Sequence, residues 1–245
     1  AGEFANDEFG TKVLIKSNSL YGAAPGKGNS AGTVYNYSLT TLSTAITYHA
    51  PDANPGQRFG TSLAVFNNTI VIGAPGNERA YVFNAQDPTH NPITPLSATI
   101  VYAGDEFGKS ISIIDGAIAI GSPGADQGRG AVHLFFGTDY GEIRTFLPPD
   151  NHSNLINSRF GTAVNFNKNS LIVGAPGAAN GGKGMVYFYA APTWDKLLSA
   201  QDVLAGKAGD YFGEGIVVDG NNVLIASPQT NNSSVVGKVS VFSVR

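Results

Sequence analysis

The apolar residues of the chain fall into short runs of four to seven residues, separated by polar and glycine-rich turns. Val, Ile, Tyr, Phe and Thr dominate these runs, and several alternate with a period of two, as half-buried strands do. The runs at 70–72 and 117–120 are almost wholly apolar, which is typical of strands buried on both faces. The one helical-looking stretch, 194–204, is interpreted as a turn followed by a strand. The pattern therefore predicts an all-β protein.

Two signatures divide these runs into copies of one unit of about 50 residues. A Phe-Gly pair opens each copy, at Phe9, Phe59, Phe107, Phe160 and Phe212. Gly-Ala-Pro-Gly or a variant of it follows, beginning at Gly22, Gly73, Gly121, Gly174 and, in the degenerate form Ala-Ser-Pro-Gln, at Ala226. Such regular recurrence identifies an internal repeat.

Each copy is predicted to form four antiparallel strands in up-and-down order. The first two are joined by tight turns at 67–68, 115–116, 167–169 and 219–222, where Asn, Asp and Gly tolerate the positive φ that such turns require. A third run follows the second signature, beginning at 32, 80, 130, 184 and 237. A weaker fourth run precedes the next Phe-Gly pair, at 43–48, 97–102, 141–146 and 199–204.

The two signatures have structural interpretations. The Phe is expected to fill the gap between adjacent sheets, and the Gly beside it to allow close approach of two backbones. The Pro of Gly-Ala-Pro-Gly is expected to end the pairing of the second strand, and the glycines to allow the turn that follows.

A four-stranded meander cannot bury both of its faces alone, so the copies are expected to pack on one another. We predict a β-propeller of four-stranded antiparallel blades in a single domain, residues 1–245, either five-bladed or part of a seven-bladed ring. The last copy ends at its third strand, and eight residues precede Phe9. We therefore expect a three-stranded last blade or an unpaired strand edge that favours self-association.

The Phe-Gly and Gly-Ala-Pro-Gly motifs, over all five copies, resemble the FG-GAP repeat family. That family includes the N-terminal propeller of the integrin α-subunit, glycosylphosphatidylinositol-specific phospholipase D and many secreted proteins. The resemblance implies a β-propeller that serves adhesion or recognition outside the cell. It also implies that ligands contact the face built by the connections between the second and third strands and between the fourth and first strands.

Many family members carry an Asp-rich calcium loop between the first and second strands. Such a loop needs several carboxylates, because calcium takes six to eight oxygen ligands. In this sequence those connections are tight turns that contain only the single acids Asp115 and Asp219. We expect no calcium site, no other metal site and no cofactor.

Composition narrows the functional classes. The chain has 245 residues, is 13% charged and has a formal net charge of −3, without a basic cluster, which argues against a nucleic-acid partner. It has no cysteine, so disulfides and cysteine-ligated metals are excluded. No apolar run is long enough to cross a membrane, and the first residues do not resemble a signal peptide. We expect a secreted or cell-surface location.

The sequence lacks the common catalytic motifs. His49, His90, His133 and His152 lie far apart, and neither a nucleophile elbow nor a phosphate-binding loop is present. His133 is interpreted as a partly buried packing residue of a third strand. We expect a non-enzymatic protein; the rival hypothesis is a hydrolase or lyase with an active site on the propeller axis.

The residue before each Phe-Gly pair alternates between acid and base in the first four copies. These residues are Glu8, Arg58, Glu106, Arg159 and Tyr211. They are predicted to form ion pairs between blades or, alternatively, a charged rim that contacts a ligand. The last four of them, with polar residues of the neighbouring connections, make up our binding candidates: Asp52, Asn54, Arg58, Asp105, Glu106, Asp150, Asn151, His152, Arg159, Asp210 and Tyr211.

These side chains offer acceptors and amides suited to sugar hydroxyls or peptide groups. We therefore expect an extracellular recognition or adhesion module that binds protein or glycan through propeller-face loops. The alternative is a self-assembling subunit of a fibre or envelope that uses its open strand edge. Five asparagines match the acceptor pattern for N-glycosylation: Asn36, Asn67, Asn151, Asn231 and Asn232.

Overall fold

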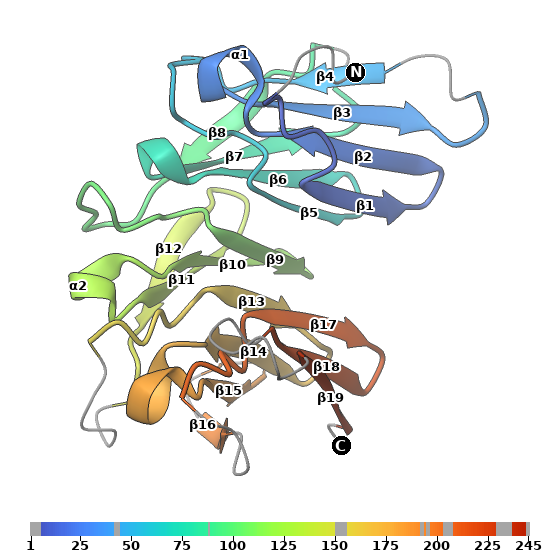
Figure 1. Cartoon of the computed structure of the whole chain (residues 1–245). Coiled ribbons are helices and arrows are strands. Elements are labelled where there is room, and N and C mark those ends of the chain that lie inside the picture. The colour runs from blue at the N-terminus through green and yellow to red at the C-terminus, as the bar shows by residue number, and fades with distance from the viewer. Residues whose placement is uncertain are drawn as a thin grey trace. The chain divides into compact units, whose positions relative to one another are not determined.

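A computed structural model of the chain describes residues 6–41, 45–87, 89–149, 156–191, 194, 197–202, 208–228 and 237–243 (Figure 1). Contacts within the chain cluster into two compact units, residues 1–111 and 112–245. The assignment of the whole chain to one domain stays a prediction.

The first unit contains two four-stranded antiparallel sheets whose strands follow chain order. The first sheet consists of β1 (Lys12–Lys16), β2 (Ser19–Ala24), β3 (Thr33–Ser38) and β4 (Ala45–Tyr48). The second consists of β5 (Ser62–Phe66), β6 (Thr69–Ala74), β7 (Arg79–Asn84) and β8 (Pro92–Leu96). Short helical turns, α1 (Lys27–Ser30) and η1 (Pro75–Asn77), join the second strand of each sheet to the third.

The second unit continues the same architecture, and the first strand of its first sheet spans the boundary between the units. That sheet consists of β9 (Ser110–Ile114), β10 (Ala117–Ser122), β11 (Ala131–Phe136) and β12 (Gly141–Phe146). The next consists of β13 (Ala163–Phe166), β14 (Ser170–Ala175), β15 (Met185–Ala190) and β16 (Leu197–Asp202). The last consists of β17 (Gly215–Asp219), β18 (Asn222–Ser227) and β19 (Lys238–Ser243). The helical turns are α2 (Ala125–Gly128) and η2 (Ala178–Gly182).

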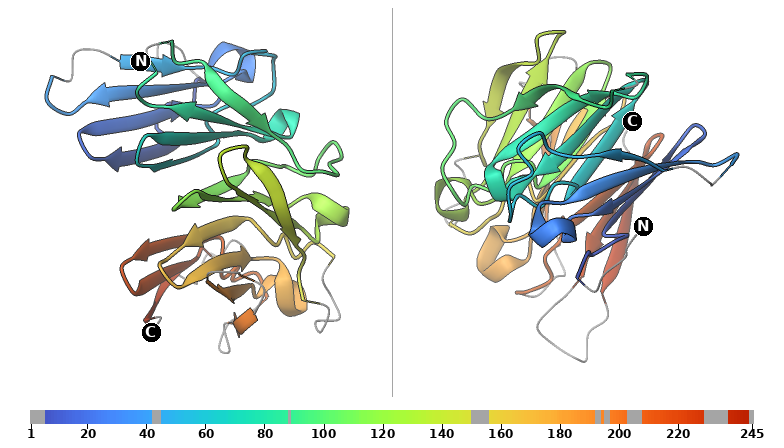
Figure 2. Two further views of the ribbon diagram at one scale, coloured as in Figure 1. Left: turned by 180° about the vertical axis from the view of Figure 1, so that it is seen from behind. Right: turned by 90° about the horizontal axis from the view of Figure 1, so that it is seen from above.

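These five small up-and-down sheets are the blades of a β-propeller, and each is seen as a separate twisted meander in Figure 2. The predicted fold class is therefore confirmed. Within the stretch 194–204, residues 197–202 form a strand, β16, rather than a helix. The positive φ predicted for the tight turns is found at Asn67 (51°), Asp115 (45°) and Gly220 (58°), whereas no residue of 167–169 has it.

Gly-Ala-Pro-Gly behaves as predicted. β6 ends at Ala74, immediately before Pro75, because proline cannot donate to the sheet. The last glycine of the motif lies against the preceding connection: a Cβ on Gly76 would lie 1.8 Å from the carbonyl oxygen of Gly56, and one on Gly177 would lie 1.8 Å from that of Asn157. Only glycine permits this approach, which locks the turn after the second strand to the segment that enters the same sheet.

The Phe of the Phe-Gly pair fills the space between neighbouring sheets in three described cases. Phe59 packs among Val34 and Tyr48 of the first sheet and Ile72 and Phe83 of the second. Phe160 and Phe212 occupy the corresponding places in the second unit, and Phe107 is also completely buried. The interpretation of this Phe as a packing wedge is confirmed for these positions.

Phe9 departs from the prediction because its side chain is 45% exposed. It makes an edge contact with Tyr35 of its own sheet, with ring centroids 5.7 Å apart. The ring packs on its own sheet rather than between two sheets: a Cβ on Gly22 of β2 would lie 3.1 Å from it. The first copy therefore keeps the motif without its buried environment.

The fourth strand of the second copy was predicted at 97–102 but lies at β8, five residues earlier. β8 contains Pro92 and Pro95, which an outer edge strand tolerates because half of its N–H groups face away from the sheet. Residues 97–102 form part of the connection to the next copy, where Ile100 and Tyr102 are exposed. In the described part of the chain the last sheet has three strands, as one of the two alternatives predicted.

Candidate functional site

The residue before each Phe-Gly pair has a left-handed backbone in all five copies. The φ values are 55° for Glu8, 56° for Arg58, 59° for Glu106, 53° for Arg159 and 53° for Tyr211. This conformation is unfavourable for residues other than glycine, so contacts with neighbouring residues must stabilise it. The repeat thus places three kinds of side chain, Glu, Arg and Tyr, at five equivalent points of the chain.

Hydrogen bonds to a loop of the preceding sheet hold this backbone in place at three of the five positions. The N–H of Arg58 donates to the carbonyl of Ser30 at 2.7 Å, and the N–H of Phe59 donates to that of Ala31 at 3.1 Å. The same pair of bonds recurs from Arg159 and Phe160 to the α2 loop, and from Tyr211 and Phe212 to the loop that contains η2. The position is therefore a fixed point of the scaffold.

At the first junction the side chains of Glu8 and Arg58 neutralise each other. The Arg58 guanidinium lies 2.6 Å from the Glu8 carboxylate and donates to both of its oxygens. The ion pair predicted between neighbouring copies is therefore present here. Glu106, the next residue in the series, lies 3.6 Å from the Lys109 ammonium in its own copy.

At the next junction within the first unit a carboxylate replaces the loop carbonyls. The loop between β6 and β7 is shorter, and Glu78 occupies its end with φ of 57°. Its side-chain oxygens accept the backbone N–H groups of Gly104 at 2.9 Å, Glu106 at 3.2 Å and Phe107 at 2.6 Å. At this junction the Glu78 carboxylate therefore has a structural role, as the acceptor for three backbone N–H groups.

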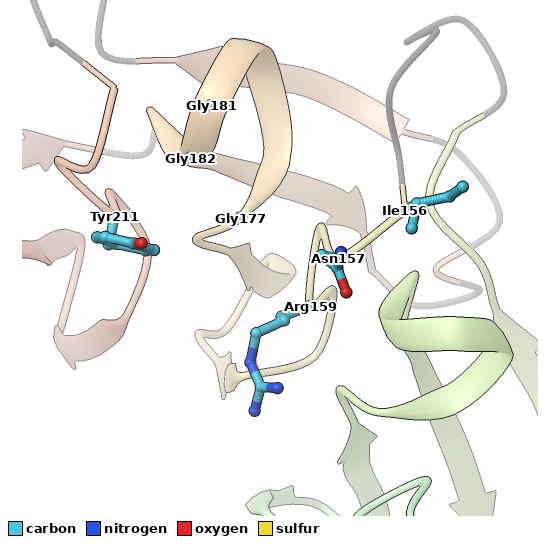
Figure 3. Close-up of a pocket in the computed structure, with 7 residues that line it drawn as sticks. All are labelled: Ile156, Asn157, Arg159, Gly177, Gly181, Gly182 and Tyr211. Carbon is cyan, nitrogen blue, oxygen red and sulfur yellow. The ribbon is translucent and has the colours of Figure 1, made fainter.

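A pocket of about 560 Å³ opens at the last junction of the second unit (Figure 3). It is built by the connection before β13, the η2 loop and the residue before Phe212, and its lining is Ile156, Asn157, Arg159, Gly177, Gly181, Gly182 and Tyr211. Two sequence-predicted candidates, Arg159 and Tyr211, thus line one cavity. It lies on connections between second and third strands and between fourth and first strands, where the family resemblance implies ligand contacts.

The pocket combines one cation, one aromatic ring and a glycine surface. Figure 3 shows Tyr211 on one side of the glycine segment and Asn157 with Arg159 on the other. A Cβ on Gly182 would lie 3.4 Å from a ring carbon of Tyr211, so the ring stands close to this glycine and an added methyl group would touch it. Gly181 and Gly182 both have φ of 79°.

Asp52 and Asn54 lie in the connection before the second copy, in the first unit. The Tyr81 hydroxyl donates to Asp52 at 3.0 Å, and the Asn77 amide donates to the Tyr81 hydroxyl at 3.1 Å. Burial alone would raise the pKa of Asp52, but the nearby polar groups of Gln57 and Tyr81 outweigh it and hold that pKa below its usual value. Asp52 is thus kept ionised within a fixed network.

The other acidic candidates are buried or lie outside the described residues. Asp105 is buried and accepts the N–H of Tyr102 at 2.7 Å, which closes the turn before Glu106. Asp210 is 2% exposed and immediately precedes Tyr211 in the chain. Asp150, Asn151 and His152 lie outside the described residues.

Two of the glycosylation candidates have described positions. Asn67 is exposed in the turn between β5 and β6, whereas Asn36 is buried within β3, where a folded chain cannot present its amide to a transferase. Asn151, Asn231 and Asn232 lie outside the described residues.

His133 is buried on β11, as its interpretation as a packing residue requires. Its Nδ1 lies 2.8 Å from the carboxylate of Glu142 on β12, and the Thr145 hydroxyl donates to that carboxylate at 2.7 Å. The group joins the third and fourth strands of one sheet. Among the described residues no cluster of three or more His, Cys, Asp or Glu side chains is arranged to hold a metal ion.

Ile156, Asn157, Gly177, Gly181 and Gly182 were not predicted as site residues, although they fall in the connections expected to bind. One signal in the sequence could have found the glycines: the loop 178–183 is one residue longer than the loops 27–31 and 125–129 and holds a glycine pair. The extra residue coincides with the wider turn of η2.

The fold and this pocket define a β-propeller with a binding-type site on its loop face. Residues 47–83 match the sequence model of the FG-GAP repeat family. That segment runs from β4 through the Phe59 wedge and Gly-Ala-Pro-Gly to β7, so the resemblance predicted from the motifs is confirmed. No curated protein matched the chain. Among the described residues no helix has the length and apolar character needed to span a bilayer.

Proposed function

We propose that the protein is a non-enzymatic recognition module, secreted or displayed on a cell surface, that binds protein or glycan through the loops of its propeller face. It acts without a cofactor. The pocket lined by Arg159 and Tyr211 carries the proposal, because it joins a cation and an aromatic ring on a rigid backbone. Binding sites on rigid scaffolds are commonly built from such loops.

The FG-GAP repeat supports this proposal, since such repeats are typical of extracellular adhesion and recognition proteins. Four of the five Phe wedges are buried in the scaffold, so the loops can vary without loss of the core. Selection for binding is then expected to act mainly on the residue before each Phe-Gly pair.

A screen of the intact protein against arrayed glycans and matrix proteins, followed by calorimetry, tests this function. Binding that falls at least tenfold in Tyr211→Ala and is unchanged in Glu214→Ala, an exposed residue nearby, is expected. Ligands bound equally by both variants would place recognition elsewhere, and turnover of a bound substrate would contradict a non-enzymatic module.

A second candidate function, self-assembly into a fibre or envelope, is favoured by β19. In the described part of the chain this strand pairs with β18 alone, and Val239 and Val241 are each 65% exposed. An apolar edge strand is a template for another strand. Sedimentation over a hundredfold concentration range tests it: growth of oligomers that Val241→Lys abolishes supports assembly, and a monomer throughout contradicts it.

A further inference from the structure

The sheets within each unit pack on one another in one recurring way. With the sheets numbered along the chain, we call the face that carries the phenylalanine of the Phe-Gly pair the wedge face, and the opposite face the back face. In the first unit the wedge face of the second sheet packs on the back face of the first, since Phe59 and Ile72 share a buried cluster with Tyr21. In the second unit the fourth sheet packs in this way on the third, and the fifth on the fourth. Each of these interfaces joins one wedge face to one back face.

The wedge face of the first sheet is apolar although it is exposed. Strand pairing aligns its side chains at the positions that the second sheet buries, and its apolar members are Phe9, Val13, Ile15, Leu20, Tyr35 and Tyr37. Ile15 is 65% exposed, and Val13 and Phe9 are exposed as well. Tyr35 contacts the rings of Phe9 and Tyr37, at centroid distances of 5.7 and 6.3 Å. An antiparallel sheet normally turns polar residues to water, so an apolar face of this kind indicates a covering partner.

The back face of the fifth sheet is the second exposed apolar surface. Val217 of β17 pairs with Leu224 of β18, and Leu224 pairs with Val241 of β19. Ala226 and Val239 form a second row beside them. Val217 is 60% exposed, and Val239 and Val241 are exposed too. The opposite face of the same sheet is buried against the fourth sheet, so only the back face is open.

These two surfaces correspond to the two halves of the recurring interface. Counted from the Phe-Gly pairs, Ile15 takes the place of Val65, and Val217 takes the place of Leu14. Leu14 and Val65 both pack on the cluster between the first two sheets. A wedge face and a back face therefore fit each other at these positions, and the described sheets leave one surface of each kind exposed.

We propose that the wedge face of the first sheet of one copy binds the back face of the fifth sheet of a second copy. Each copy offers one surface of each kind, so the contact is heterologous and can repeat head to tail. A standard interface has roughly 20–30 residues a side. The two surfaces offer fewer, so the association is reversible and grows with concentration. This inference goes beyond the recognition function, and it differs from pairing at the edge of β19, which uses no residue of the first sheet.

Sedimentation velocity of the whole chain over a hundredfold concentration range tests the proposal, and wild type is expected to form oligomers that grow with concentration. Ile15→Glu disables the wedge face, and Val217→Glu disables the back face. Each is expected to raise the dissociation constant about 100-fold or more, because the contact would bury a carboxylate without a partner. Both positions are more than half exposed, so the fold tolerates the change. Ile143→Glu is the matched control: Ile143 of β12 is 57% exposed and lies on neither surface.

An equimolar mixture of Ile15→Glu and Val217→Glu gives the sharper test, because each variant keeps one intact surface. The mixture is expected to form a dimer of the two variants that grows no further. Oligomers that persist in both single variants would overturn the proposal in favour of edge pairing.

A wild-type monomer at every concentration would also overturn the proposal. The natural chain has no cysteine, so Ile15→Cys and Val217→Cys can be labelled with a maleimide at one site. Slow labelling of such a monomer would mean that the two faces are covered within one chain, and fast labelling that they meet water. Neither result affects the screen for glycan and protein ligands, so failure of this inference and failure of the recognition function are distinguishable.

Discussion

The carboxylate of Glu78 accepts the backbone N–H of Phe107 at 2.6 Å and so ties the loop after β6 to the segment that enters β9. Gly104 and Glu106 donate to the same carboxylate. At the first junction the carbonyls of Asn29, Ser30 and Ala31 receive the three equivalent donors. The Glu78 carboxylate thus accepts three hydrogen bonds that three backbone carbonyls accept at the first junction.

Glu78→Ala is expected to lower the free energy of unfolding by about 2–4 kcal/mol, because three N–H groups lose a charged acceptor. Urea denaturation monitored by fluorescence measures the change. Glu214→Ala, at an exposed residue, serves as control and is expected to stay within about 0.5 kcal/mol of wild type. A Glu78→Ala protein as stable as its control would show that water replaces the carboxylate.

Phe160→Ala is expected to destabilise the protein by about 3–5 kcal/mol, since it removes a fully buried ring from the core between two sheets. Phe9→Ala changes the same motif where the ring is half exposed, so its loss should be about 1 kcal/mol or less. The pair is compared by denaturation under identical conditions. Equal losses would mean that Phe9 is enclosed in solution.

Gly76→Ala is expected to cost more than about 2 kcal/mol or to prevent folding, because its Cβ would lie 1.8 Å from the Gly56 carbonyl oxygen. Gly215→Ala is the control: there the added Cβ would meet Ala226 at an ordinary 3.5 Å. Thermal unfolding of both variants is the measurement. If the Gly76→Ala protein unfolds at the same temperature as the Gly215→Ala control, the close approach is refuted.

The ion pair between Arg58 and Glu8 is expected to contribute only about 0.2–1 kcal/mol, since the two side chains are 41% and 40% exposed. A double-mutant cycle with Arg58→Ala and Glu8→Ala measures the coupling. It should shrink further in 1 M salt, where screening acts over about 3 Å. A coupling above 2 kcal/mol would mean that the pair is shielded from water.

The protein is expected to lose stability as pH rises above 10. Burial raises the pKa of Tyr48 and of Tyr187 to about 12, from 10.0 for a free tyrosine. The unfolded chain therefore releases these protons first, and each such tyrosine lowers the free energy of unfolding by about 1.4 kcal/mol per pH unit between pH 10 and 12. Below pH 10 these residues leave stability independent of pH.

Absorbance of tyrosinate together with circular dichroism follows this alkaline transition. Buried tyrosines should ionise only as the fold is lost, and Tyr48→Phe with Tyr187→Phe should flatten the slope. Ionisation of all ten tyrosines near pH 10 with the strand signal intact would contradict the burial of both hydroxyls.

Most of the fold follows from the sequence because its signals are local. A Pro that stops a strand at Ala74 and an Asn that turns at position 67 act within a few residues, and comparable signals recur in other copies of the repeat. The edge strand β8 was misplaced because apolar character does not mark an outer strand that pairs on one side only. The exposure of Phe9 depends on which groups surround its ring in the folded protein, and the Phe-Gly motif alone does not encode them.

The pocket was predictable only in part. Arg159 and Tyr211 were found because a conspicuous motif marks their position, 52 residues apart in equivalent places. Asn157 and the glycines contribute through backbone conformation and close approach, which residue type alone does not reveal. Their convergence depends on the packing of two sheets, and that depends on contacts distant in sequence.

The left-handed residue before each Phe-Gly pair has one more consequence. Because hydrogen bonds of the main chain fix that conformation, the fold makes few demands on the side chain attached to it, and Glu, Arg and Tyr all occur there. Evolution can therefore exchange one for another and alter what a given junction attracts while the framework stays constant. A family of such chains would be expected to diversify its ligands first at these five positions.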